Sequence, residues 1–431
     1  MKATELLQRL IQFNTVNPPG NEGEAIAFLE GLLKESGFEC RVLSRDPDRP
    51  NLVARLRGRE PGPNLAMISH VDTVPADPEE WSRDPWGGDL ADGYIWGRGA
   101  LDMKDQVASE TAACLKLAKD GWRPGRGDLI LVVAADEETG AHYGAKWLCQ
   151  EHPEEVRCEW VINEGAGEMV EVEGRRLFTL AVGEKGTFRF TIRTKGIAGH
   201  GSIPAVGENA LLKLVPALER LGSQPPREST PDTDLFLERL LGEVPDDLED
   251  ALTRIERFDP DLARLVADPM LGVTLAPTMA SASSRENVIP SRAELVVDCR
   301  TLPGMDAADA LQRIVSVTGE GDWEITFNDP VVGSSSEYGG PLAEAIEEWA
   351  AGGGRDAEIL PMVMPGFSDS HWFRKAFGAT VFGFCPQSAM PLAETRPLVH
   401  SADERVAVAD VELMENLFTW LPPRLLGTAT P

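Results

Sequence analysis

Three short clusters of acids and histidines have the residue types needed to bind metal ions and activate water. The first is Met67-Ile-Ser-His70-Val-Asp72. Because alternate residues of an extended chain lie on the same side, His70 and Asp72 can be neighbours. A carboxylate beside a metal-binding imidazole fixes its tautomer and raises its basicity. The pair is therefore compatible with a ligand and its orienting group, although one such pair is a weak signal.

The second cluster is Trp96-Gly-Arg-Gly99-Ala-Leu-Asp102. Its two glycines permit a close backbone approach just before the aspartate. Asp102 could spread its two carboxylate oxygens across two cations. It could instead cap a helix that starts near Lys104, and the spacing leaves both interpretations open.

The third cluster places Asp136, Glu137 and Glu138 directly after the apolar run Leu129–Ala134. Packed carboxylates repel one another and resist desolvation. The only base nearby in the sequence is Lys146, so a metal ion is the economical compensating charge, and a solvated acidic turn is the alternative. One glutamate could bind the ion while its neighbour acts as a base on water.

Together these segments resemble the aminoacylase/carboxypeptidase family of dinuclear zinc metallopeptidases. The matching segments are SHVDTVPA, WGRGALDMK, DEETGA, NEGAG from Asn163, and VHSADE ending at Glu404. They occur in the expected order along most of the chain, which is far more specific than any single motif. The family includes glutamate carboxypeptidase, acetylornithine deacetylase and succinyl-diaminopimelate desuccinylase. The resemblance implies a hydrolase that cleaves the amide bond of N-acyl amino acids or short peptides with a free carboxylate.

The resemblance also implies a set of metal ligands. One ion would be held by His70 and Glu164, the other by Glu138 and His400, with Asp102 bridging the two. Imidazole and carboxylate ligands suit zinc, with cobalt or manganese as substitutes. Two divalent ions per subunit are therefore the expected cofactors.

Three further residues receive catalytic roles from the resemblance. Glu137 would be the general base on a water that bridges the ions, and Asp72 would orient the first histidine ligand. His200, in Gly199-His200-Gly201-Ser202, would reach across a homodimer interface and stabilise the oxyanion in the partner's site. Without the resemblance, His200 could equally be a surface-loop histidine.

Substrate binding is expected from two regions. Asn287 and Arg300 would bind the substrate's carboxylate, and Gly366 and Ser368 in the loop PGFSDSH could contact ligand. Two alternative functions remain: an aminopeptidase or dipeptidase on the same fold, and a catalytically silent dimeric binding protein.

The elements that must position these residues alternate between strands and helices, which predicts an α/β fold. The resemblance implies a three-layer α/β/α catalytic domain of the zinc-exopeptidase type with an inserted ferredoxin-like α+β dimerisation domain. The predicted domains are residues 1–184 and 332–431 for the catalytic part and 185–331 for the insert, which contains a helical insertion at about 223–277. In the catalytic part the predicted helices and strands are Glu24–Ser36, Asn51–Leu56, Asn64–Ser69, Val107–Ala118, Leu129–Ala134 and Val411–Leu421.

The predicted insert has a β-α-β-α-β order. Its elements are expected at Thr187–Thr194, Asn209–Leu221, Ala293–Cys299, Ala307–Val317 and Trp323–Phe327. The first of these strands alternates polar and apolar residues, as a sheet with one solvated face does.

Composition sets the remaining limits. A chain of 431 residues with 42% hydrophobic and 26% charged residues predicts a two-domain globular protein. A net charge of −29 argues against nucleic acid and anionic membranes as partners. The amphipathic N-terminal segment, which ends at the helix-breaking run Asn17-Pro18-Pro19-Gly20, lacks signal-peptide features, so a cytoplasmic location is expected. Six scattered cysteines without a C-x-x-C pair predict reduced thiols.

Overall fold

The computed structural model describes residues 1–429 and divides into two compact units. The first comprises Met1–Val182, Ser335–Met362 and the chain from Ser368 onward. The second comprises Gly183–Ser334 and Val363–Phe367. The short segment Val363–Phe367 therefore clusters with the second unit, although the sequence analysis assigns it to the catalytic part.

The first unit is built on a ten-stranded sheet. Its main order is β1-β2-β6-β3-β7-β19-β9-β17, and β8 and β18 pair with β9. Neighbouring strands β6, β3, β7 and β19 run parallel. The strands are β1 Glu39–Ser44, β2 Pro50–Leu56, β3 Leu65–His70, β6 Leu129–Ala134, β7 Trp160–Asn163, β8 Met169–Val172, β9 Arg175–Glu184, β17 Ser334–Ser335, β18 Glu358–Met364 and β19 Thr380–Gly383.

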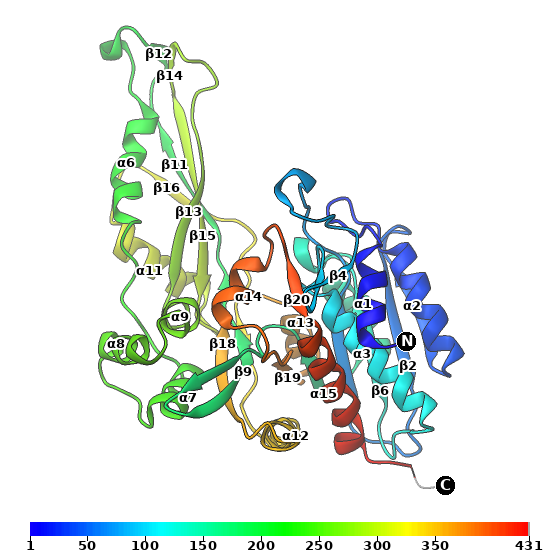
Figure 1. Ribbon diagram of the computed structural model, residues 1–431. Coiled ribbons are helices and arrows are strands. Elements are labelled where there is room, and N and C mark those ends of the chain that lie inside the picture. Colours follow the sequence, from blue (N-terminus) through cyan, green and yellow to red (C-terminus); the bar gives the residue numbers. More distant parts are fainter. Residues whose placement is uncertain (430–431) are drawn as a thin grey trace. The chain divides into compact units, whose positions relative to one another are not determined.

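Helices cover both faces of this sheet. Leu65 and Met67 of β3 belong to one hydrophobic core, whereas the equally buried Ala66 and Ile68 face the opposite side. Figure 1 shows α1, α2, α3 and α15 beside these strands, and apolar residues of all four helices contribute to the first core. Helix α13 contacts β7, β19 and α4. The helices are α1 Ala3–Ile11, α2 Gly23–Glu35, α3 Lys104–Lys119, α4 Ala145–Glu151, α5 Pro153–Val156, α12 Gly340–Ala351, α13 Ser370–Phe377, α14 Leu392–Leu398 and α15 Val408–Leu426.

A small sheet joins the C-terminal part of the first unit to its middle. Strand β20 (Arg405–Ala407) pairs with β5 (Tyr94–Trp96), which pairs in turn with β4 (Asp89–Ala91). This pairing places the segment that follows His400 beside the segment that leads to Asp102.

The second unit contains an antiparallel sheet of order β10-β15-β11-β16, with β13 also paired to β15. Figure 1 shows α6 and α11 along this sheet, and both helices contribute to its core. At one end, β12 and β14 form a two-stranded ribbon. The elements are β10 Gly186–Thr187, β11 Phe190–Lys195, β12 Gly199–His200, α6 Ala210–Arg220, β13 Thr274–Ser281, β14 Val288–Ile289, β15 Arg292–Thr301, α11 Ala307–Thr318 and β16 Glu324–Phe327.

The segment predicted as a helical insertion contains α7 Pro231–Leu241, α8 Leu248–Phe258, α9 Pro260–Leu262 and α10 Asp268–Met270. Its last predicted residues, 274–277, belong instead to strand β13, which the sequence analysis missed. Six consecutive residues of β13 are exposed and Pro277 interrupts its pairing register, so the alternation that marks a strand is absent.

Two global features complete the description. No helix within residues 1–429 is long and apolar enough to cross a membrane. All six cysteines are free thiols, four of them buried.

Candidate metal centre

Three parallel strands deliver acids and a histidine to one edge of the sheet in the first unit. Strand β3 ends at His70, which is in register with Ala134 at the end of β6. The acidic run 136–138 follows β6, and Glu164 follows β7. Because the carboxyl ends of parallel strands meet at one edge, segments far apart in the sequence converge there.

The five predicted ligands form two groups that share Asp102. His70 Nε2 lies 3.1 Å from Asp102 Oδ1 and 3.8 Å from Glu164 Oε1. His400 Nε2 lies 3.0 Å from Asp102 Oδ2 and 3.2 Å from Glu138 Oε2. Within each group the donor atoms lie within 4.8 Å of one another. The carboxylate of Asp102 therefore presents one oxygen to each group.

This donor set fits two divalent cations. Each group combines an imidazole with carboxylates, the ligands that zinc and similar ions prefer. Buried Glu138 Oε1 has no hydrogen-bond partner within residues 1–429. The alternative role of Asp102 as a helix cap is not seen, because α3 begins at Lys104 with Met103 at its N-cap and no side-chain cap.

The electrostatics of the centre reflect this crowding of acids. Burial, helped by the charge of Asp102, raises the pKa of Glu164 to about 8. Hydrogen bonds to Asp102 and Glu138 raise the pKa of His400 to about 10. Burial opposes ionisation of Asp102, but its hydrogen bonds from His400 and His70 prevail and lower its pKa. Without cations the imidazoles retain protons, and a bound metal ion must displace them.

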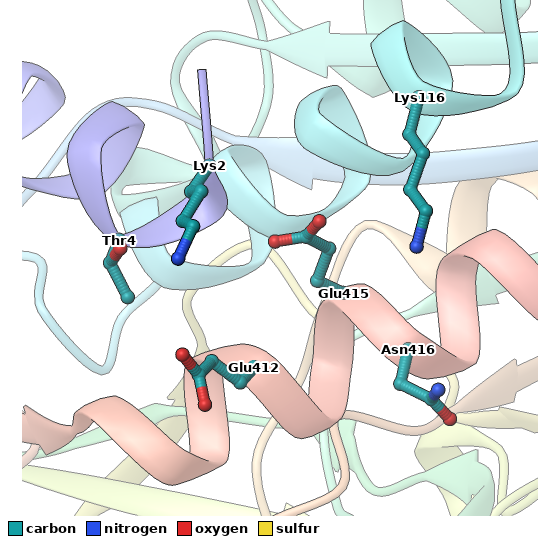
Figure 2. Close-up of a pocket in the computed structure, with 6 residues that line it drawn as sticks. All are labelled: Lys2, Thr4, Lys116, Glu412, Glu415 and Asn416. Carbon is teal, nitrogen blue, oxygen red and sulfur yellow. The ribbon is translucent and has the colours of Figure 1, made fainter. Parts of the chain in front are cut away.

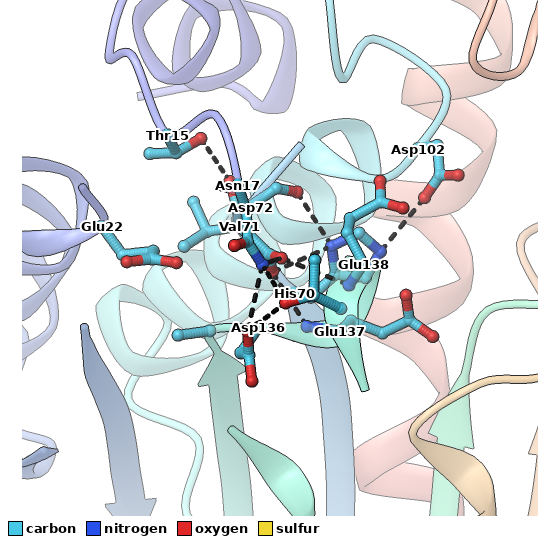
Figure 3. A network of polar contacts seen from close by, with 12 residues as sticks. Thr15, Asn17, Glu22, His70, Val71, Asp72, Asp102, Asp136, Glu137 and Glu138 are labelled. Atoms are coloured by element: carbon cyan, nitrogen blue, oxygen red, sulfur yellow. Dashed lines mark hydrogen bonds and ion pairs between the residues drawn. The ribbon is translucent and has the colours of Figure 1, made fainter. Parts of the chain in front are cut away.

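Glu137 belongs to neither group, but it interacts electrostatically with Glu164 and His70 of one and with Glu138 of the other. Figure 3 shows it next to Glu138 and near His70. Both glutamates sit in a short 3-10 turn, Glu137–Thr139, directly after Asp136. Burial, reinforced by the charge of Glu164, raises the pKa of Glu137 well above its ordinary value. A carboxylate with a raised pKa is better suited both to accept a proton and to return it.

Asp72 contacts both His70 and the glutamate turn. The imidazole Nδ1 of His70 lies 3.0 Å from the backbone carbonyl oxygen of Asp72 and 3.5 Å from its carboxylate. The carboxylate itself accepts hydrogen bonds from the backbone N–H groups of Glu137 and Glu138, at 3.2 and 3.3 Å. Its carbonyl thus makes the shorter contact to the imidazole, and its side chain holds the turn.

Asp136 is neutralised by a distant arginine rather than by the nearest base in the sequence. Arg49 Nη2 lies 3.1 Å from Asp136 Oδ1, and Thr139 and the backbone N–H of Tyr143 also donate to this carboxylate. Lys146, the only base nearby in the sequence, lies over the ring of Trp372, 4.9 Å from its centroid.

Glu404 anchors the loop that carries Asp102. Its fully buried carboxylate pairs with Arg98 and accepts hydrogen bonds from the backbone N–H groups of Gly99, Leu101 and Asp102. In the sequence it appeared only as the last residue of a matching segment, four positions after His400. That proximity to a ligand is the signal that could have identified it.

Asp369 is a second residue that the sequence analysis missed. It is buried at the start of α13, and its Oδ2 has no hydrogen-bond partner in the described part of the chain. Burial raises its pKa to about 7. Its charge in turn helps to raise the pKa values of Glu137 and Glu164, after their own burial.

Two predicted residues of the second unit lie together on the β12/β14 ribbon. His200 is exposed, and its Nδ1 lies 2.8 Å from the hydroxyl oxygen of Ser202. The backbone carbonyl of Asn287, next to β14, accepts a 2.8 Å hydrogen bond from the N–H of Gly201. His200 and Asn287 are therefore neighbours.

Arg300 lies near the other end of β15, paired with Asp298 at 2.8 Å. An extended strand rises about 3.3 Å per residue, so roughly 25 Å of β15 separates Arg300 from the start of that strand near the ribbon. The structure therefore does not bring Asn287 and Arg300 of one chain together, although the prediction has both bind the same carboxylate.

The predicted substrate loop is divided between the units. In the second unit, a Cβ placed on Gly366 would meet only Met364, at an ordinary distance of 3.5 Å. In the first unit, Ser368 is buried and its hydroxyl accepts a hydrogen bond from Ser370 N–H. Among residues 1–429, no neighbour of Gly366 thus requires a glycine.

Comparison with known proteins identifies the family. Residues 66–420 match the model of Peptidase family M20/M25/M40. A succinyl-diaminopimelate desuccinylase from Cereibacter sphaeroides is 27% identical over 425 residues, covering 95% of each chain. The match to the family model confirms the resemblance inferred from the motifs.

Solved structures show the same fold. The metallo-carboxypeptidase Sso-CP2 from Sulfolobus solfataricus aligns with a TM-score of 0.74 at 17% identity, covering 99% of each chain. The YXEP protein from Bacillus subtilis, described as a dinuclear metal-binding peptidase, aligns with a TM-score of 0.60 at 15% identity, covering 99% of this chain and 98% of its own. These likenesses confirm the predicted α/β fold class. The chain belongs to peptidase family M20/M25/M40 and is a hydrolase of amide bonds with the fold of dinuclear metal-binding peptidases.

Proposed function

We propose that this hydrolase acts on N-acyl amino acids or short peptides that carry a free carboxylate, as a deacylase or carboxypeptidase. The observation that carries the proposal is the pair of histidine–carboxylate groups sharing Asp102, with Glu137 interacting with members of both. The curated relatives named succinyl-diaminopimelate desuccinylase favour the deacylase side. We therefore rank an N-acylated amino acid with an acidic acyl group as the first substrate to test.

The proposed cofactors are two zinc ions, which cobalt or manganese could replace. His70 and Glu164 would hold one, Glu138 and His400 the other, and Asp102 would contribute one oxygen to each. When bound, such ions polarise a carbonyl oxygen and lower the pKa of water.

Glu137 is the proposed general base. Its carboxylate would take a proton from the attacking water as the water oxygen bonds to the amide carbonyl carbon. It would then deliver that proton to the leaving nitrogen as the carbon–nitrogen bond breaks. A raised pKa supports this role, because a base that must also act as an acid works best when its pKa lies near the working pH.

We further propose a homodimer formed through the second unit. Helix α6 exposes an apolar row that its own core does not cover, including Leu212 at 66% exposure, and the edge strand β13 exposes Met279 at 68%. Contiguous exposed apolar surface of this kind is typical of protein interfaces. His200 would act in the partner's active site as an oxyanion donor, and Asn287 would accompany it because both lie on one ribbon.

Arg300, Gly366 and Ser368 remain proposed substrate contacts. Arg300 would bind the substrate carboxylate, a group that guanidinium recognises well. Within residues 1–429 a Cβ on Gly366 would meet only Met364, at 3.5 Å, so this backbone is open to the approach of a ligand. The six free thiols fit the reducing cytoplasm, which we propose as the place of action.

The decisive experiment combines a substrate panel with Glu137→Gln. N-succinyl and N-acetyl amino acids are compared with free dipeptides, and metal content is measured for each protein. We expect acylated substrates to be preferred, and Glu137→Gln to abolish turnover while retaining two ions per chain. Glu151→Gln, an exposed glutamate on α4, serves as the control. A metal-replete Glu137→Gln protein with a near-normal rate would exclude the assigned base, and preference for free dipeptides would favour the peptidase alternative.

A further inference from the structure

The side-chain amide of Asn17 lies in a buried polar cluster next to the metal centre. Its Nδ2 is 2.8 Å from Asp72 Oδ2, 3.1 Å from Asp136 Oδ1 and 3.0 Å from Thr139 Oγ1. The residue is 3% exposed. Figure 3 shows this amide between the two aspartates, on the side of Asp72 that faces away from Asp102.

The backbone around Asn17 fixes it in this position. The N–H of Asn17 donates to the carbonyl of Thr73 at 2.9 Å, and Thr73 N–H donates to the carbonyl of Thr15 at 3.0 Å. The Thr15 hydroxyl also donates to the carbonyl of Val71 at 2.6 Å. These bonds tie residues 15–17 to the segment that directly follows His70. These hydrogen bonds thus fix the position of the Asn17 amide beside Asp72.

Two buried carboxylates contact the same amide nitrogen in this region. Asp72 and Asp136 are both almost fully buried, and like charges in a desolvated site repel. Arg49 reaches Asp136 and also makes a close pair with Glu22. Within residues 1–429, the hydrogen bonds of the Arg49 side chain go to Glu22 and Asp136 and not to Asp72. The Asn17 amide is the side-chain donor that contacts both aspartates.

Asp72 connects the Asn17 amide to the metal centre through its contacts with His70 and the glutamate turn. Its carbonyl oxygen holds Nδ1 of His70, and its carboxylate holds the backbone N–H groups of Glu137 and Glu138. A shift of Asp72 therefore moves a ligand from each metal group together with the proposed base. Partners that orient metal ligands in this way commonly affect metal affinity by about 10–100-fold.

We propose that Asn17 is a positioning residue. By bridging Asp72 and Asp136, its amide aligns His70 with the Glu137–Glu138 turn and so sets the affinity of the centre for metal ions. The inference rests on the proposed dinuclear function. It gives a role to the run Asn17-Pro18-Pro19-Gly20, which the sequence alone shows only as a helix breaker.

The test is a titration of chelator-treated protein with Co²⁺, followed by visible absorption, together with thermal unfolding. We expect Asn17→Ala to weaken the binding of at least one Co²⁺ ion about 10–100-fold and to change the spectrum. Asn17→Asp should be at least as damaging, because it adds a third carboxylate to the cluster. Asn17→Ser retains a hydroxyl donor, so its Co²⁺ affinity should lie between those of wild type and Asn17→Ala. If Asn17→Ala does not fold, Asn17→Ser provides the measurement instead.

Asn51→Ala is the matched control. Asn51 is also a fully buried amide, and it donates to the carbonyls of Leu43 and Tyr143 and accepts from Ala135 N–H, without contacting a carboxylate. We expect this variant to lose stability but to keep its Co²⁺ affinity within about twofold, well short of the loss that ligand-orienting partners cause.

The outcomes separate the two proposals. Wild-type Co²⁺ affinity and spectrum in the Asn17 variants would overturn the positioning role, as would an equal loss of affinity in Asn51→Ala. If wild-type protein binds fewer than two Co²⁺ ions, the dinuclear function fails whatever the variants do. If wild type binds two ions and the Asn17 variants match it, only the inference about Asn17 fails.

Discussion

Glu404 offers the sharpest prediction about how the metal centre is supported. Its carboxylate is fully buried, pairs with Arg98, and accepts backbone hydrogen bonds at 3.1 Å from Gly99, 2.7 Å from Leu101 and 3.2 Å from Asp102. Glu404→Gln keeps the size of the side chain but replaces one acceptor oxygen by an NH₂ group. In either orientation of the amide that group would face donors, Arg98 and Gly99 on one side or Leu101 and Asp102 on the other.

The cost follows from the burial of the pair. Removing one partner of a buried ion pair costs about 3–5 kcal/mol, because the other charge is left uncompensated. In a unit of this size each kcal/mol corresponds to about 2–4 °C in Tm. Glu404→Gln should therefore lower Tm by about 6–20 °C. Since Asp102 N–H is one of the lost or weakened contacts, the gain in Tm on adding Zn²⁺ should also shrink.

The assay is thermal unfolding of both proteins with EDTA and with excess Zn²⁺. Glu394→Gln is the control, because Glu394 pairs with Arg405 at 2.6 Å in the same region but is partly exposed. Partly exposed pairs contribute only about 0–1 kcal/mol. If Glu404→Gln unfolds at the same temperature as Glu394→Gln, the assigned anchoring role is wrong.

Three further predictions address protons and assembly. Hydrogen bonds to Asp102 and Glu138 raise the pKa of His400 to about 10, so Zn²⁺ binding at pH 7 should release protons and should strengthen as pH rises. Calorimetry in two buffers of different ionisation enthalpy measures the proton release. Identical binding heats in the two buffers would contradict the prediction. Burial raises the pKa of Glu110 from near 4.5 to about 8, so its folded-state proton stabilises the protein fully below pH 4.5, and that stability is lost as pH rises through 8. Glu110→Gln should flatten this dependence in urea unfolding at pH 5 and pH 9, and an unchanged slope would refute it. Leu212→Lys on α6 should convert the proposed dimer to monomers in sedimentation, whereas Leu90→Lys, at the exposed Leu90 of β4, should not. A dimeric Leu212→Lys protein would exclude this interface.

Elements with a local pattern could be predicted from the sequence. The continuous apolar run Leu129–Ala134 is strand β6 with the predicted bounds. Helix α3 was predicted from Val107, but it begins at Lys104 because its polar first turn is buried against the rest of the unit. Strand β13 escaped prediction because an edge strand that exposes six successive residues has no apolar alternation.

The candidate site likewise contains residues that could be predicted from the sequence and residues that could not. The five proposed ligands could be named because their motifs are specific and ordered along the chain. The residues that hold these ligands in place could not be named, because each depends on contacts between segments that are distant in the sequence. Arg49 reaches Asp136 across 87 positions, and no local rule prefers it to Lys146. Asn17 likewise meets Asp136 across 119 positions.

The pairing of β20 with β5 has a consequence for the order of events during synthesis. Arg98 and Glu404 are separated by 306 positions, and His400 lies just ahead of β20. Once synthesis has passed Glu164, directly after β7, all three residues of one metal group have been made. The other group lacks its imidazole until the last tenth of the chain emerges. The second group can therefore be completed only late in translation, shortly before β20 and α15 are made.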